Sequence, residues 1–268
     1  MRLQIEAVLD YAFPEPADVL LTIEVAQSFD QILIEDILLI DGSGPLRPIA
    51  GEESFGRRTW MRVQGDFLAS YRATVDIDRQ LPILADMQIM PLSELPTLVV
   101  PYLWPSRYCE ADKFERFVER EFAGLTDGRK VVAMADWIYR NIEYRLGSSD
   151  SSTTAVDAFV KRQGVCRDFA HLLASFARAA GIPARLVSAY AWDLSPPDFH
   201  AVVEVWLDES WHLVDATSLA PLDGMARIAV GRDATDIAFM TIFGSAALRA
   251  QSIEVRRVDP SATAALRG

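Results

Sequence analysis

Hydrophobic and polar residues alternate through the first third of the chain, with the period of two that is typical of half-buried β-strands. The alternating runs lie at residues 3–9, 19–25, 32–34, 60–63 and 67–75. Gly65-Asp66 separates the last two runs and predicts a hairpin turn between them. Several short strands with turn residues between them predict a small β-sandwich domain over residues 1–95.

Further along the chain, hydrophobic residues recur at helical spacing. A proline-spaced connector precedes this part, with Pro91, Pro96, Pro101 and Pro105. Such punctuation predicts the domain boundary within the connector. Helices are then predicted over residues 110–122, 128–144, 154–162 and 168–180. Gly181-Ile182-Pro183 ends the last of them, because glycine suits a helix C-terminus and proline cannot continue the helix.

After residue 183 the pattern again favours strands. These are predicted over residues 184–191, 200–207, 211–216 and 252–258. The turn at Asp208-Glu209-Ser210 joins the two middle strands as a hairpin. The chain is therefore predicted to have an α+β fold, in which the β-sandwich precedes a core of helices packed on an antiparallel sheet. This second domain is expected over residues 96–260, followed by a frayed tail over residues 261–268.

Composition narrows the classes of partner and compartment. The 268 residues carry a formal net charge of −12. Nucleic acid and anionic membranes are therefore not expected as partners, because binding either needs a basic patch. No apolar run reaches the roughly 18 to 20 residues of a membrane helix, and Met1 to Glu6 lack the apolar core of a secretory signal. We expect a cytoplasmic protein; its oligomeric state is not indicated.

The chain has only two cysteines, Cys109 and Cys166. Two free thiols are expected in a reducing compartment, with a Cys109–Cys166 disulfide as the alternative. These cysteines lie 57 residues apart and, with three scattered histidines, show no zinc-ligand spacing. No metal or cofactor is therefore expected.

Cys166 is the strongest candidate for chemistry. It stands where the loop residues Gly164-Val165 give way to a helical pattern, so its thiol faces the positive end of the helix dipole. This position favours the nucleophilic thiolate. His200 and Asp215 follow on strand-like runs, which completes the order nucleophile, base and orienting carboxylate.

The predicted hairpin brings the last two residues together. A two-residue turn at Asp208-Glu209 places Val202 opposite Asp215, with His200 one diagonal step away on the same face. The same register places Trp206 across from Trp211. A three-residue turn or a bulge would change this parity and separate His200 from Asp215.

Four segments resemble the transglutaminase-like cysteine hydrolases, and more narrowly the bacterial transglutaminase-like cysteine proteases. They are GVCRDFA at 164–170, GIPAR at 181–185, HAVVEVW at 200–206 and WHLVDAT at 211–217. PSRYC at 105–109 and GRDATD at 231–236 also resemble the bacterial branch. The resemblance covers residues 100–245 and implies a papain-like α+β core, often preceded by a small β domain.

The resemblance also implies an activity. Cys166, His200 and Asp215 fall on the positions of a Cys-His-Asp triad that acts on a peptide, isopeptide or other amide through a thioester. Hydrolysis is the favoured outcome, since nothing suggests the calcium-binding surfaces of animal transglutaminases. A transglutaminase-type acyl transferase or an amide-forming biosynthetic enzyme is the first alternative. A non-catalytic binding or scaffold protein on the same fold is the second.

Other residues are weaker candidates. Tyr190 and Trp192 border the loop 193–198 that leads to His200, so they are candidate substrate-binding residues, with core packing as the equal alternative. Asp168, in the first helical turn, is expected to cap the helix. A structural role is expected for His171, His212 and Cys109.

Overall fold

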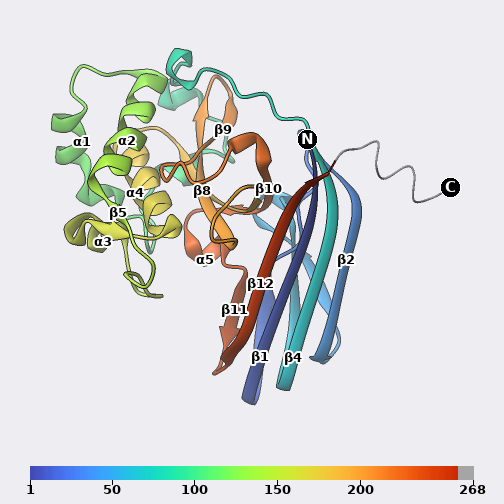
Figure 1. The fold of residues 1–268 in the computed structure, drawn as a ribbon. Coiled ribbons are helices and arrows are strands. Elements are labelled where there is room, and N and C mark those ends of the chain that lie inside the picture. The colour runs from blue at the N-terminus through green and yellow to red at the C-terminus, as the bar shows by residue number, and fades with distance from the viewer. Residues whose placement is uncertain (259–268) are drawn as a thin grey trace.

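The computed structural model describes residues 1–258, and the tail predicted over residues 261–268 lies outside them. Figure 1 shows long strands along one side of the molecule and helices along the other, with a smaller sheet between them. The long strands form one antiparallel six-stranded sheet. Its members are β1 (Arg2–Leu21), β2 (Gln31–Ser43), β3 (Arg47–Ala50), β4 (Arg57–Ile77), β11 (Met240–Phe243) and β12 (Ala247–Val258).

The predicted β-sandwich is wrong, because these strands form one sheet and not two packed sheets, and the strands are longer than predicted. The runs 60–63 and 67–75 belong to one continuous strand, β4, so Gly65-Asp66 is not a hairpin turn. Gly65 instead pairs with Phe13 beside a bulge in β1, and it has a φ of +81°. A glycine takes this conformation without the steric cost of a side chain, so β4 continues through Gly65 as one strand.

β11 and β12 complete this sheet. β12 pairs with β1 from Arg2↔Val258 to Ala12↔Ala247, and β11 pairs with the last residues of β1. The strand predicted over residues 252–258 is therefore confirmed as part of a longer one. Residues 240–258, which the predicted division assigns to the second domain, are paired with the first.

The other half of the molecule combines helices with a four-stranded antiparallel sheet, in the order β10-β7-β8-β9. Its strands are β7 (Ala184–Ala191), β8 (Phe199–Leu207), β9 (Ser210–Val214) and β10 (Met225–Gly231). The helices are α1 (Glu115–Glu121), α2 (Asp127–Asn141), α3 (Ala155–Lys161), α4 (Cys166–Ala179) and α5 (Ala234–Ile237). The short strands β5 (Glu143–Tyr144) and β6 (Gln163–Gly164) form a parallel pair. The α+β class is confirmed, and a helix lies in each range predicted from residue 128 onwards, although α2 ends at Asn141 and not at Tyr144.

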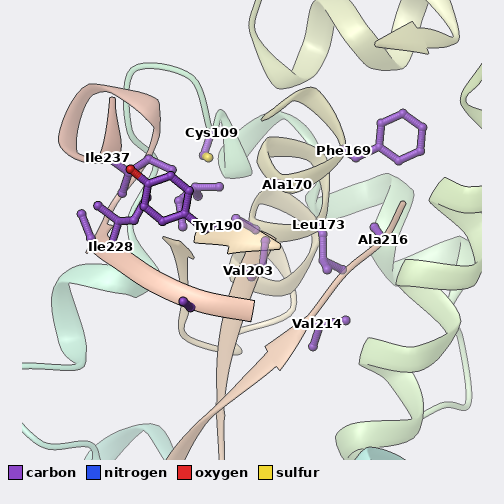
Figure 2. Packing of buried hydrophobic residues seen from close by; sticks show 14 of the residues in the cluster. Cys109, Phe169, Ala170, Leu173, Tyr190, Val203, Val214, Ala216, Ile228 and Ile237 are labelled. Atoms are coloured by element: carbon purple, nitrogen blue, oxygen red, sulfur yellow. The ribbon is translucent and has the colours of Figure 1, made fainter. Parts of the chain in front are cut away.

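Helix α4 lies at the centre of this half. Eleven of its fourteen residues are buried, so its direction is fixed by packing on every side. Figure 2 shows Ala170 and Leu173 of α4 in the same core as Val203 of β8 and Val214 of β9. This packing places the N-terminus of α4 near the start of β8.

Buried charges connect the two sheets. Glu204 on β8 is fully buried and bonds both Arg185 on β7 and Arg227 on β10. Arg227 also pairs with Asp30, just before β2. This network fixes the four-stranded sheet, which carries His200, against the long sheet. Within residues 1–258, none of the helices is long and apolar enough to cross a bilayer.

Candidate active site

Cys166 is the first residue of α4 and is half-buried. Val165 before it is extended, and its N–H donates to Oδ2 of the buried Asp168 over 2.8 Å. Asp168 thus caps the helix as predicted, while its Oδ1 accepts from Ser149 Oγ over 3.0 Å. Gly164 is needed here, since a Cβ on it would lie 2.7 Å from the Asp168 Cβ. Burial raises the pKa of Asp168.

The β8–β9 hairpin has the predicted register. Val203 pairs with Val214 and Trp206 with Trp211. Asp208 and Glu209 both have positive φ angles, which is the conformation of a tight two-residue turn. Because the turn adds no extra residue, His200 and Asp215 meet, and His200 Nε2 lies 2.9 Å from Asp215 Oδ2.

The carboxylate that meets His200 is itself held in place. Asp215 Oδ1 accepts from the backbone N–H of Thr217 over 2.8 Å and from its Oγ1 over 2.7 Å. The side chains of His200 and Asp215 are only 1% and 4% exposed, so water screens their interaction little. The ring of His200 is therefore fixed through Nε2, which leaves Nδ1 as the nitrogen free to exchange a proton.

The electrostatics favour a charged His200. Burial alone would lower its pKa, but hydrogen bonding to Asp215 and Cys166 and the negative charges of these groups raise the pKa to about 10. An imidazolium beside the Cys166 sulfur is the arrangement that stabilises a thiolate.

This charge can be measured directly. We expect the ring signal of His200, one of three histidines in the chain, to titrate near pH 10 in an NMR experiment. Because the pKa is raised above its unfolded value, the pair stabilises the fold fully below a pH of about 6.5 and loses this contribution as the pH rises toward 10. Asp215→Asn should lower the pKa by at least about one unit. A ring that titrates near its ordinary value in both proteins would contradict this assignment.

Cys166 and His200 line the same cavity, of about 600 Å³. Its walls include Arg107 and Tyr108 from the connector, Arg167 from α4, Asp198 and Phe199 before and at the start of β8, and Met240 to Ile242 from β11. The long sheet therefore forms part of the cavity wall through β11. Another cavity, of about 850 Å³ beside Arg2 and Phe29, is lined by neither cysteine nor histidine.

The two predicted substrate-binding residues do not line this cavity. Tyr190 is fully buried, donates its hydroxyl to the Ile23 carbonyl over 2.8 Å and stacks on Tyr71. Trp192 packs against Gly224, with the guanidinium of Arg257 over its ring. Both side chains lie where the two sheets meet. For Tyr190, the alternative role of core packing therefore applies.

The other sequence candidates lie apart from the reacting groups. Cys109 is fully buried, and burial raises its pKa to about 11. Both cysteines are free, so the disulfide alternative is wrong. His171 is buried against Tyr108 and accepts from the Ala234 N–H, and burial lowers its pKa to about 3. His212 lies beside Ser210 and the Leu207 carbonyl.

The sequence pattern does not indicate a role for Tyr144, because the helix predicted over residues 128–144 includes it. The helix ends at Asn141. Tyr144 lies on β5, pairs with Gly164 just before Cys166, and packs its ring on Phe169. Burial and then the charge of the Cys166 sulfur raise its pKa to about 12, so the phenol keeps its proton beside Cys166. A two-residue strand carries no readable periodicity, so the pattern offered no signal.

Comparisons with known proteins identify the family of the chain. The sequence model of the Transglutaminase-like superfamily matches residues 116–216. A provisionally named cysteine protease from Cytophaga hutchinsonii is 35% identical, and its crystal structure superposes with a TM-score of 0.92 over 97% of this chain and 91% of that chain. The chain belongs to the transglutaminase-like superfamily.

Two curated relatives extend the comparison. This transglutaminase-like protein is 30% identical over 148 residues to an uncharacterised protein of Mycobacterium leprae, covering 51% of this chain and 52% of that one. It is 35% identical over 78 residues to an uncharacterised protein of Mycobacterium tuberculosis, covering 29% of this chain and 25% of that one. The chain thus matches about half, or less, of the length of these relatives.

Proposed function

We propose that this transglutaminase-like protein is a cysteine-dependent amide hydrolase that acts through a thioester on Cys166. One observation carries the proposal: a half-buried cysteine at a helix start shares a cavity with a histidine, which a buried carboxylate holds at 2.9 Å. Each group can perform the step that its position favours.

The acylation step uses the charged pair. The Cys166 sulfur attacks the amide carbonyl carbon, a C–S bond forms, and the carbonyl electron pair moves to oxygen. As this intermediate collapses, the C–N bond breaks and His200 donates its Nδ1 proton to the departing nitrogen. An amine or ammonia leaves, and the acyl group remains on sulfur as a thioester. Asp215 holds the ring orientation throughout.

Deacylation runs the proton transfer in reverse. The now neutral His200 accepts a proton from water, whose oxygen attacks the thioester carbon. The C–S bond breaks, the carboxylic acid leaves, and the thiolate and the imidazolium are restored. An amine in place of water would give the transferase outcome by the same steps.

The oxyanion of both intermediates needs hydrogen-bond donors. The backbone N–H of Cys166 belongs to the first turn of α4, where amides have no partner within the helix. Tyr144 lies beside Cys166 and keeps its proton, with a pKa of about 12. We assign the Cys166 N–H and the Tyr144 hydroxyl as the two donors.

Tyr144→Phe should therefore lower kcat by about 100-fold with little change in KM, since a donor used mainly in the transition state is lost. The ring and its packing on Phe169 remain. Steady-state kinetics measure the change, and Tyr139→Phe, at an exposed tyrosine on α2, is the matched control. Equal kcat values for wild type and Tyr144→Phe would remove Tyr144 from the mechanism.

The proposed activity is tested with a mixed library of peptide, isopeptide and simple amides. We expect products released by water and an acyl adduct on Cys166, both detected by mass spectrometry and both absent from Cys166→Ala. Added amines that replace water in the product would identify the transferase alternative. Product formation that is the same in Cys166→Ala would contradict the proposed function.

A further inference from the structure

Two arginines line the cavity that contains Cys166 and His200. Arg107 comes from the connector before the helices, and Arg167 follows Cys166 on α4. Asp198 is the one acidic residue among the described residues that line the cavity. The chain as a whole has a net charge of −12, so two positively charged side chains in this cavity contrast with the rest of the molecule. They would attract a negatively charged substrate group.

The guanidinium of Arg167 is hydrogen-bonded to neutral groups. Its Nη2 donates to Ser149 Oγ over 2.6 Å and to the carbonyl oxygen of Asp150. Its nearest carboxylate oxygen, on Asp168, is 3.8 Å away and accepts from Ser149. Arg167 is therefore oriented without a tight ion pair, so its positive charge remains available to the cavity.

Arg107 is positioned by an aromatic ring. Its guanidinium lies over the ring of Tyr108, 4.9 Å from the ring centroid. Tyr108 is fixed in turn, because its hydroxyl donates to the Ser151 carbonyl over 2.7 Å and its ring stacks on His171. Among residues 1–258, no carboxylate forms a salt bridge with Arg107. An exposed guanidinium on a fixed platform is suited to bind a carboxylate.

Among residues 1–258, Asp198 forms no salt bridge with Arg107 or Arg167. Its Oδ1 accepts from the Phe199 N–H over 2.7 Å and from Gln251 Nε2 over 2.6 Å. It lies beside the start of β8, on the segment that leads into His200, whereas Arg107 and Arg167 come from the connector and α4.

We propose that Arg107 and Arg167 form a carboxylate-binding subsite, which selects amides whose acyl group bears a free carboxylate, such as a γ-linked glutamyl group. The inference rests on the proposed function, since it concerns the acyl group presented to Cys166. The scissile carbonyl lies at Cys166 and the carboxylate reaches the arginines. Such a group forms charge-assisted hydrogen bonds that a neutral amide of the same shape cannot match.

The test uses protection of Cys166 from iodoacetamide, which requires no turnover. The probes are glutarate and its uncharged counterpart glutaramide. We expect glutarate to protect Cys166 at concentrations about tenfold lower than glutaramide, since hydrogen bonds to charged groups are worth more than neutral ones. Arg107→Gln should reduce this difference to about twofold or less. Arg120→Gln, at an exposed arginine on α1 outside the cavity, is the control and should retain it.

The outcomes separate the two proposals. If Cys166 reacts readily with iodoacetamide but glutarate protects no better than glutaramide, the carboxylate subsite is wrong and the proposed function stands. The subsite is also wrong if Arg107→Gln and the charge-reversed Arg107→Glu keep the full preference for glutarate. If Cys166 reacts no faster than a cysteine in the unfolded chain, the proposed function fails and the subsite fails with it.

Discussion

Replacing Cys166 by alanine should lower kcat/KM for amide hydrolysis by about 10,000-fold or more. The sulfur forms the covalent intermediate, and no other thiol can replace it. Alanine favours helix, so α4 should begin at the same residue and the fold should persist. Kinetics on a responsive amide measure the loss, and circular dichroism checks the fold.

Cys109→Ala is the matched control. Cys109 is fully buried, and burial raises its pKa to about 11, so its thiol stays protonated at neutral pH. The variant should retain kcat/KM within about twofold, although a small cavity lowers its stability. Activity that survives in Cys166→Ala, or that disappears in folded Cys109→Ala, would contradict the assignment of the nucleophile.

Glu204→Gln should lower the free energy of unfolding by about 3 to 5 kcal/mol, because breaking a buried ion pair leaves uncompensated charge. Glu204 is fully buried; its Oε2 accepts from Arg185 Nε over 2.8 Å and its Oε1 from Arg227 Nη1 over 2.6 Å. A neutral amide cannot balance both arginines. Differential scanning calorimetry should show Tm about 10 °C lower.

The same residue gives a pH dependence with a defined sign. Burial opposes the charge of Glu204, but Arg185 and Arg227 hold its pKa below the usual value. Its contribution is therefore present above the unfolded pKa, about 4.3, and is lost as the pH falls through the folded pKa. The difference in Tm between wild type and Glu204→Gln should shrink in that acidic range.

Glu254→Gln provides the comparison for this stability effect. Glu254 lies on β12 with a side chain that is 56% exposed, so its replacement should shift Tm by less than about 2 °C. A shift as small as this in Glu204→Gln would show that the network between the sheets contributes little to stability.

The positions of Cys166, His200 and Asp215 could be predicted from the sequence because local rules determine them. A tight turn at Asp208-Glu209 fixes the hairpin register, and the register brings His200 to Asp215. Gly164 and the cap from Asp168 mark the start of α4, which places Cys166. Each relation spans fewer than about twenty residues, over which turn and capping chemistry decide the structure.

The long sheet could not be predicted because its contacts are distant in sequence. β12 pairs with β1, from which it is separated by almost the whole sequence. The alternation of hydrophobic and polar residues does not identify which strand is the partner. Gly65-Asp66 is a sequence typical of a turn. Pairing with β1 on both sides of the bulge nevertheless keeps β4 extended. Arg107 lies in an irregular segment and Tyr144 on a two-residue strand, so no hydrophobic periodicity predicts the position of either residue.

We propose that Cys166 is an activated nucleophile paired with His200. The most direct measurement is the rate of iodoacetamide labelling at each cysteine, located by peptide mapping at pH values from about 5 to 9. We expect Cys166 to be labelled faster than Cys109 across this range, and this reactivity to be lost in His200→Ala. Labelling of Cys166 no faster than that of the buried Cys109, or unchanged in His200→Ala, would contradict it.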